Sequence, residues 1–286
     1  VNRYGDEDTD GNLNNVTENF NLNYFTYPGL GKFHRTGYSE KDIVDYNTKN
    51  IKLQNSLHFR INNITEIIYG FNYSTGTTVY QGDNRISLKN IQFWQNKLEI
   101  KQHEKFFIRA YRTKEDAGDS YDAVFTAFKL QEYNHMSNQD WYTQYKNNWR
   151  DNFNWEDLNW EIPEYDFINQ QWNFQGNPID INHWIEMSDS ILNGNGQLII
   201  NNHNLVRTLT DLESNRLVPG TLEFKEAIED ITGKTNYIHG GTGFYDKSAL
   251  NHIHIEKKTK SDFGILTIGG NMRQYQPNSK GSIFLD

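Results

Sequence analysis

The sequence contains no cysteine, and this absence removes several kinds of chemistry at once. The chain forms no disulfide, carries no thiolate nucleophile and offers no thiolate ligand to a metal. It also has no run of 18 apolar residues, so no segment has the character of a transmembrane helix. Any site in this chain is therefore built without thiol chemistry.

Basic charge and apolar residues are also scarce. The 28 Lys and Arg residues are outnumbered by 37 Asp and Glu, which gives a net charge of -9. Because binding to nucleic acid needs a basic surface, we expect no nucleic-acid partner. Only 36% of residues are hydrophobic and the mean hydropathy is -0.83, yet 14% are aromatic. A disordered chain would lack these aromatics, so we expect a folded β protein with extensive polar surface.

The clearest secondary-structure signal is KNIKLQNSLHFRI, residues 49–61. From Ile51 to Ile61, apolar residues occupy the odd positions and polar residues the even ones, apart from Asn55. Alternate side chains of a strand point to opposite faces, so the pattern predicts a strand with one apolar and one polar face. The segment EIIYGFNYS (66–74) repeats the alternation after a turn signal at 62–63, which predicts a hairpin.

The pattern divides the chain into three parts. Residues 1–131 hold strands and loops, with further strands predicted at 87–101, 105–113 and 121–131. Residues 132–247 are rich in Asn and Trp and lose the alternation, which indicates a long insertion with short helices at 181–192 and 220–233. Strands return in 248–286, at 248–258 and 262–276. Alternation alone leaves a membrane barrel and a soluble β-sheet protein both open.

Several longer segments carry a resemblance to a known family. They are RTGYSEKDIVDYNTKNIKLQNSLHFRI, FNYSTGTTVYQGDNRISLKNIQFWQNKLEI and KFFIRAYRTKEDAGDSYDAVFTAFKLQ, followed in order by VPGTLEFKEAIEDI, YDKSALNHIHIE and GGNMRQYQPNSKGSIF. Together they resemble the barrel region of outer-membrane TonB-dependent receptors of the Bacteroidetes type. The run TGTTVYQGDNR is the most specific piece. The resemblance covers nearly the whole chain, apart from the part near 133–200.

This resemblance implies an all-β fold, part of a large antiparallel transmembrane barrel of 22 strands with a plugged lumen. It implies ligand uptake across the bacterial outer membrane, energised by TonB, with no catalytic activity and no cofactor. The implied partners are outer-membrane lipid and TonB, the latter through a plug domain absent from this chain. A surface lipoprotein or companion chain is a further candidate. The spans alone need roughly 220 residues, so we expect an internal segment of a longer protein.

The same resemblance assigns the two faces of the strands. Ile51, Leu53, Leu57 and Phe59 would face lipid, and the long insertion would lie outside the cell. The candidate lumen-facing residues are His58, Arg60, Asn72 and Arg109. The two arginines would meet either an anionic ligand or acidic residues of the plug.

An acidic turn near the N-terminus is a candidate calcium site. Asp6, Asp8 and Asp10 precede a glycine with the spacing of a calcium loop. The motif then slips, because its twelfth position is Thr17 and the glutamate comes one residue later. An acidic surface turn is the alternative interpretation.

Two other clusters have both a chemical and a structural interpretation. His252 and His254 share a strand face and would suit zinc, but no third ligand has convincing spacing, and a lumen-facing polar pair is the better interpretation. In KEDAGDSYD (114–122), Glu115 or Asp116 with Asp119 would form a carboxylate pair for acid–base work. A solvated loop is the preferred alternative there.

The tryptophans of the insertion are candidate ligand contacts, namely Trp141, Trp149, Trp155 and Trp160, with Trp172 and Trp184 nearby. Aromatic rings among Asn and Asp suit a sugar-binding surface. The core of a small subdomain is the preferred alternative, because Trp is mostly buried. A competing function is therefore an extracellular soluble β-protein that binds or degrades carbohydrate.

Overall fold

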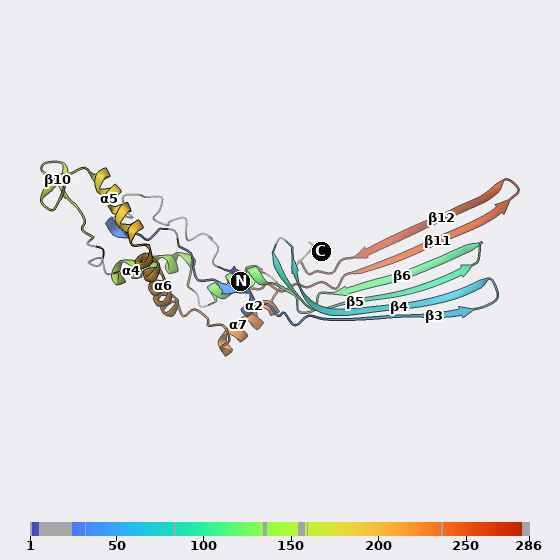
Figure 1. Cartoon of the computed structure of the whole chain (residues 1–286). Coiled ribbons are helices and arrows are strands. Elements are labelled where there is room, and N and C mark those ends of the chain that lie inside the picture. The colour runs from blue at the N-terminus through green and yellow to red at the C-terminus, as the bar shows by residue number, and fades with distance from the viewer. Residues whose placement is uncertain are drawn as a thin grey trace. The chain divides into compact units, whose positions relative to one another are not determined.

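The structure is a computed structural model that describes residues 2–5, 25–31, 33–82, 84–133, 136–153, 158, 160–235 and 237–281 (Figure 1). Strands account for 41% and helices for 31% of the fold. The chain forms two compact units, each with its own architecture. Unit 1 comprises residues 1–2, 39–129 and 220–286, and unit 2 comprises residues 3–38 and 130–219.

A large antiparallel sheet dominates unit 1. Its strand order is β12-β11-β6-β5-β4-β3, and the short β7 pairs with β5. The strands are β3 (Lys49–Arg60), β4 (Thr65–Gln81), β5 (Arg85–Gln102), β6 (Phe106–Asp116), β7 (Tyr121–Asp122), β11 (Ala249–Ser261) and β12 (Gly264–Gln276). The predicted hairpin of 49–61 with 66–74 is confirmed, as are the strands predicted at 87–101, 105–113, 248–258 and 262–276. In Figure 1 the six long strands run side by side in a curved layer.

The two ends of this sheet differ. At one end, short turns at 61–64, 103–105 and 262–263 join β3 to β4, β5 to β6 and β11 to β12. Backbone hydrogen bonds close them, such as Ile61 N to Thr65 O at 3.0 Å and Lys105 N to Gln102 O at 3.0 Å. At the other end, β4 and β5 extend past their neighbours, and residues 117–248 separate β6 from β11. We call these the turn end and the insertion end.

The strand predicted at 121–131 is wrong, because only β7 is extended and the segment continues as helix α3 (Ala123–Glu132). The Asp122 carboxylate accepts a hydrogen bond from the Phe125 amide at 2.9 Å, as a helix N-cap does. Ala123, Ala127 and Leu130 are buried at helical spacing. The cap and this buried stripe favour a helix despite the strand signal before it.

The predicted helix at 220–233 is confirmed as α7 (Leu222–Gly233), and the other short helices of unit 1 are α2 (Glu40–Ile43) and η4 (Tyr237–His239). The Thr221 side chain accepts a hydrogen bond from the Phe224 amide and caps α7. Phe224, Ala227 and Ile231 form its buried face.

We expect Thr221→Ala to destabilise α7 by about 1 kcal/mol, because the cap's hydrogen bond to an otherwise unpaired amide is lost. Hydrogen exchange of residues 222–233, measured by mass spectrometry in the full chain, will report faster exchange. Lys225→Ala, on the exposed side of the same helix, is the control and should change the exchange little. Equal exchange in the two variants would contradict the capping role.

Unit 2 is mainly helical. Its elements are β1 (Arg3–Tyr4), α4 (Asn138–Asn152), β8 (Glu164–Asp166), β9 (Gln171–Phe174), β10 (Asn177–Ile179), α5 (Ile181–Gly194) and α6 (Gly196–Glu213), and β1 pairs with β2 (Tyr38–Ser39). The helix predicted at 181–192 is confirmed as α5. Helix α4 packs on α6 around an aromatic core that includes Trp141, Tyr145 and Trp149 with Val206.

The fold class expected from the sequence is correct for the sheets, which are antiparallel, but not for the whole chain. Helices α4, α5 and α6 make unit 2 largely helical, and α3 and α7 add to unit 1. The six-stranded path of the large sheet ends at β3 and β12, so this sheet is open in the described part of the chain.

Candidate functional site

The register of the large sheet gives its two faces different chemistry. One row across the six strands contains Leu57, Tyr69, Leu98, Ala110, Ile253 and Met272. The next row contains Phe59, Ile67, Ile100, Ile108, Ile255 and Gly270. We call this side of the sheet the apolar face. Leu57 and Met272 are 66% and 64% exposed, so this face is not covered by the rest of the described chain.

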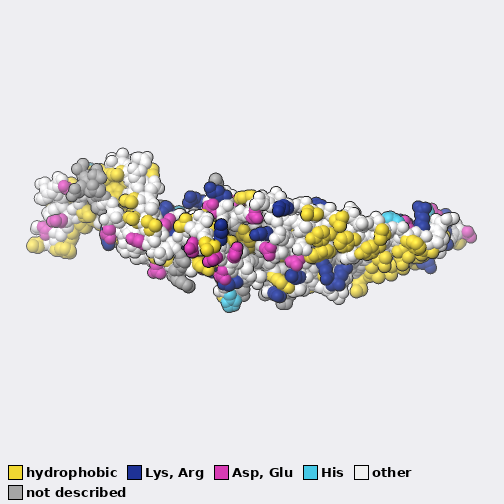
Figure 2. Space-filling model, turned by 90° about the horizontal axis from the view of Figure 1, so that it is seen from below, with side chains coloured by type: hydrophobic (Ala, Val, Ile, Leu, Met, Phe, Trp, Pro, Cys, Tyr) yellow, Lys and Arg dark blue, Asp and Glu magenta, His cyan; other side chains and the backbone are white. Residues whose placement is uncertain are grey.

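The apolar residues of this face form a band. Its limit nearer the insertion end, which we call the upper limit, changes from strand to strand. On β3 the band begins at Ile51, and on β4 it begins at Tyr73, in the row of Leu53. On β6 and β12 it begins in the row of Leu57, three rows nearer the turn end. On β11 it is continuous from Ile253 in the same row, with Ala249 in the row of Leu53 separated from it by Asn251, as Asn55 interrupts the band on β3. Figure 2 shows hydrophobic side chains gathered over the strands, with Lys and Arg side chains beside them.

The opposite side, the polar face, carries a network of charged side chains. Glu66 contacts His58 Nδ1 through Oε1 at 2.7 Å and Lys101 Nζ through Oε2 at 2.9 Å. On the neighbouring strands, Glu99 Oε2 accepts a hydrogen bond from Arg109 Nε at 2.8 Å. Glu99 is only 7% exposed, so the flanking cations cover it.

The four candidate lumen residues all lie on the polar face. His58 and Arg109 share one row with Glu99, and Arg60 lies in the next row with Glu66. Asn72 lies nearer the insertion end, where its amide donates to Gln95 Oε1 at 3.1 Å. Sequence reasoning missed the acidic partners of this network, although the polar positions of the strands at 66–74 and 87–101 contained the signal.

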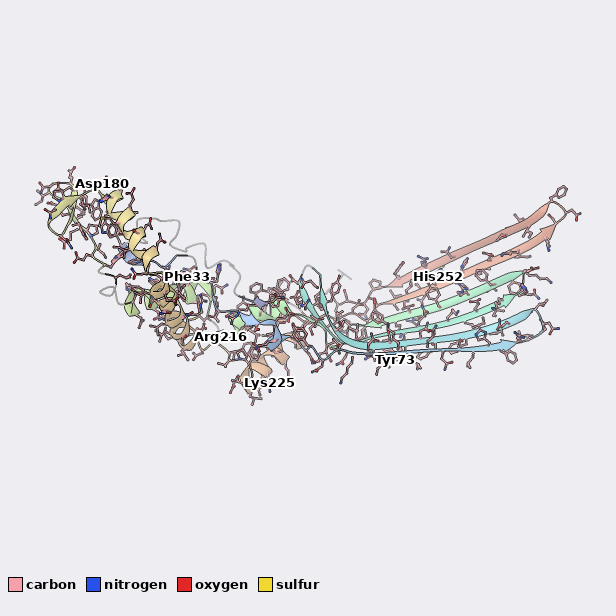
Figure 3. All side chains as sticks on the ribbon, in the orientation of Figure 1. Phe33, Tyr73, Asp180, Arg216, Lys225 and His252 are labelled. Carbon is pink, nitrogen blue, oxygen red and sulfur yellow. The ribbon has the colours of Figure 1, made fainter. Side chains whose placement is uncertain are left out.

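His252 and His254 also lie on the polar face, with aromatic neighbours. The His254 ring meets Phe107 edge to face at 4.8 Å, and the His252 ring lies 4.7 Å from Tyr111. In Figure 3, His252 on β11 and Tyr73 on β4 are labelled, and the register assigns them to opposite faces.

Among the described residues, no group of three His, Cys, Asp or Glu side chains is arranged to hold a metal.

The carboxylates of the segment 114–122 are engaged locally. Asp116 Oδ1 accepts a hydrogen bond from the Gly118 backbone N–H at 2.9 Å, and Asp119 Oδ2 accepts one from the Asn90 side-chain Nδ2 at 2.8 Å. Gly118 has φ +61°, and a Cβ there would lie 2.4 Å from Lys89 O, so only glycine fits this tight approach. Burial, together with the neighbouring Asp246, raises the pKa of Glu115. Residues 114–116 end strand β6 and residues 121–122 form β7, so the connecting loop is shorter than the sequence predicted.

The described tryptophans of the candidate set lie inside unit 2. Trp141 and Trp149 are 1% and 0% exposed, and Trp149 Nε1 donates to Pro28 O at 2.9 Å. Trp160 is half-buried, and its ring lies 5.8 Å from that of Trp184. Two of the indoles therefore leave no ring face for a sugar. Trp155 and the predicted calcium residues Asp6, Asp8 and Asp10 lie outside the described residues.

A histidine sits against this aromatic core. The His203 ring lies 4.3 Å from the Trp149 ring, and Nδ1 lies 2.8 Å from the Tyr145 hydroxyl. Burial lowers the pKa of His203 to about 4, and the nearby Arg207 charge acts in the same direction. The imidazole is therefore neutral in the folded unit at pH 7.

We expect His203 to make unit 2 less stable in acid. Between the ordinary pKa of about 6.5 and the folded value, the unfolded chain binds a proton that the folded chain does not, so stability falls as pH falls through this window. Six of the seven tryptophans belong to unit 2, so urea denaturation followed by Trp fluorescence at pH 7 and pH 5 measures the effect.

The control is His203→Gln, which keeps a polar side chain but does not titrate. Burial raises the pKa of Asp211, and that shift acts in the opposite direction, so the comparison is between the two proteins at each pH. The pH dependence should be weaker in His203→Gln than in the wild type. An unchanged dependence would mean that other groups cause it.

No family model, no curated protein and no solved structure matches this chain. None of the helices in the described ranges is both long and apolar enough to cross a membrane. The functional assignment therefore depends on the chemistry of the two faces of the sheet.

Proposed function

We propose that unit 1 is part of the wall of a transmembrane β-barrel in a bacterial outer membrane, and that the protein takes up a ligand with energy supplied through TonB. The observation that supports this most is the apolar band on one face of the sheet, opposite a charged network on the other. The resemblance to TonB-dependent receptors points to the same function. The proposed role is binding and passage, without catalysis.

The band suits lipid better than water. Monomeric soluble proteins rarely expose contiguous apolar patches larger than a few hundred Å². Here apolar side chains continue across all six long strands, and residues such as Phe59 and Ile268 are 66% and 65% exposed. In a bilayer the same side chains contact lipid acyl chains, so they do not incur the free-energy cost of exposing apolar surface to water.

The dimensions of the strands support the proposal. The six strands are 11 to 18 residues long, and a tilted strand needs about 9–11 residues to cross a bilayer. The short turns at one end and the long connection of residues 117–248 at the other are also typical of outer-membrane barrels, although β4 and β5 are joined at that second end by a short turn at the tip of their extended hairpin. The long connection, which includes most of unit 2, would then lie outside the cell.

The polar face suits a water-filled lumen. Paired charges such as Glu99 with Arg109 are tolerated where water reaches them, but they would be costly against lipid. Strands β3 and β12 have free edges in the described sheet, and unpaired edges are not viable in lipid. We therefore expect further strands of the same barrel to pair with both edges. TonB would act on such a barrel through a plug domain in its lumen.

Membrane fractionation of the bacterium that makes this protein tests the proposal. We expect the polypeptide detected by an antibody to unit 2 to stay in the membrane pellet after an alkaline carbonate wash and to be released only by detergent. A soluble periplasmic protein, released by the same wash, is the control. Release of this protein by carbonate would overturn the proposal and favour the soluble carbohydrate-binding alternative.

A further inference from the structure

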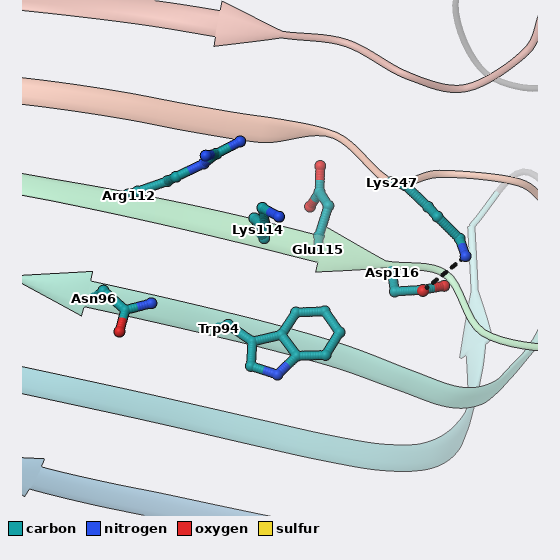
Figure 4. A pocket seen from close by; sticks show the side chains of 7 residues that line it. All are labelled: Trp94, Asn96, Arg112, Lys114, Glu115, Asp116 and Lys247. Carbon is teal, nitrogen blue, oxygen red and sulfur yellow. Dashed lines mark ion pairs between the residues drawn. The ribbon is translucent and has the colours of Figure 1, made fainter.

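Basic side chains replace the apolar band at its upper limit on β6. Above Ala110, the next two rows of the apolar face carry Arg112 and Lys114. On β5 the same rows hold Asn96 and Trp94. A surface hollow lies here, and Figure 4 shows its lining: Trp94, Asn96, Arg112, Lys114, Glu115, Asp116 and Lys247.

These cations lack acidic partners, unlike Lys101 and Arg109 on the polar face. In the described part of the chain, Arg112 and Lys114 form no ion pair, and Arg112 donates only to the neutral Gln276 Oε1 at 3.3 Å. Asp116 lies in the hollow, but its Oδ2 contacts Lys247 Nζ at 3.4 Å. Glu115 also lines the hollow from a polar-face position of β6, and it forms no ion pair with Arg112 or Lys114 in the described part of the chain. Two positive charges therefore lie beside an apolar surface, and neither is joined to a carboxylate by an ion pair among the described residues.

The neighbours of these cations fit the boundary between acyl chains and head groups. The Trp94 ring lies 5.9 Å from that of Tyr73, and such amphipathic rings collect at membrane interfaces. Long basic side chains rest their methylene groups on apolar surface and extend the charge towards water. Asn96 Oδ1 accepts from the Tyr69 hydroxyl at 2.7 Å, so its amide nitrogen remains available as a donor.

We propose that this hollow binds the phosphate of a membrane lipid whose head group has a net negative charge, in the leaflet nearer the insertion end. This inference depends on the proposed function, because it needs the apolar face to lie in a bilayer. The Arg112 guanidinium would bind two phosphate oxygens, Lys114 would add a second positive charge, and Asn96 would donate a hydrogen bond. The acyl chains would lie on the band below, against Ala110 and Leu98.

The test measures lipid retention by the full chain in neutral detergent micelles doped with phosphatidylglycerol or phosphatidylcholine. Native mass spectrometry counts the bound lipids, and inorganic phosphate serves as a competitor. We expect the double variant R112Q/K114Q to bind phosphatidylglycerol about 10- to 30-fold more weakly than the wild type. The matched control K52Q/R273Q removes one Lys and one Arg from the polar face and should bind as the wild type does.

Each outcome decides the proposal. Equal retention of phosphatidylglycerol by the wild type and R112Q/K114Q would overturn it, as would equal preference for phosphatidylcholine. Displacement of the lipid by inorganic phosphate at matched concentration would mean that a free anion is the ligand, which also overturns it. A chain that stays monodisperse without detergent would refute the proposed function itself. A detergent-dependent chain without lipid selectivity would refute this inference alone.

Discussion

Under the proposed function, Leu57→Arg will strongly destabilise the folded protein in a bilayer. Leu57 lies in the row that is apolar on all six strands, and it is 66% exposed. A charged side chain on the lipid face of a barrel costs about 2–4 kcal/mol near the midplane. We therefore expect the ratio of folded, protease-resistant chain to unfolded chain in lipid vesicles to fall by about 30- to 1,000-fold.

Gln54→Arg is the matched control for this substitution. Gln54 lies on the same strand but on the polar face, in a row with Asn72, Gln95 and Thr113. An arginine there stays in water, so this variant should insert and resist protease as the wild type does. Equal behaviour of the two variants would mean that the apolar face does not contact lipid.

Trp149→Ala will unfold unit 2 or leave it marginally stable. The indole is fully buried, stacks on Phe153 with ring centroids 5.6 Å apart, and donates to Pro28 O. Removing a buried tryptophan costs about 3–5 kcal/mol, because the cavity does not close and the Pro28 carbonyl loses its partner. We expect the circular dichroism of α4 and α6 to be lost at lower urea concentration.

Trp172→Ala separates a core role from a ligand-contact role. Trp172 is half-buried on β9 and stacks on Phe25 at 5.2 Å, so its removal should cost clearly less stability than that of Trp149. A Trp149→Ala protein that unfolds as the wild type does but loses binding to a sugar column would contradict the core role. That result would revive the carbohydrate-binding alternative.

The sheet could be predicted from the sequence because a period of two is a local signal. Residues 51–61 carry it with Asn55 as the one exception, and the observed strand follows it. The ion pairs could not be predicted, because they depend on register. Glu99 and Arg109 are ten residues apart and meet only through the pairing of β5 with β6.

Unit 2 was harder to predict for a different reason. Its core joins Leu30 and Phe33 to α4 and α6, more than 100 residues away. Helix α4 is rich in Asn and Gln, and its buried face consists of four aromatic residues and Asn148, all of low helix propensity. Tertiary packing, and not local propensity, therefore stabilises α4 as a helix. The segment 121–131, which the sequence predicted as a strand, is mainly helical for a similar reason, since the Asp122 cap and the buried stripe of Ala123, Ala127 and Leu130 together favour the helix.

The slope of the apolar band also defines an angle. Its upper limit moves by six residues, from the row of Ile51 on β3 to that of Leu57 on β6, and it stays in that row on β12. Averaged over the five steps from β3 to β12, with about 3.4 Å per residue along a strand and about 4.8 Å between strands, a band kept level in a bilayer would tilt these strands by about 40°. Barrels close at tilts of about 35–45°. Under the proposed function, the places where the sequence changes from apolar to polar would therefore set an average tilt compatible with a closed wall.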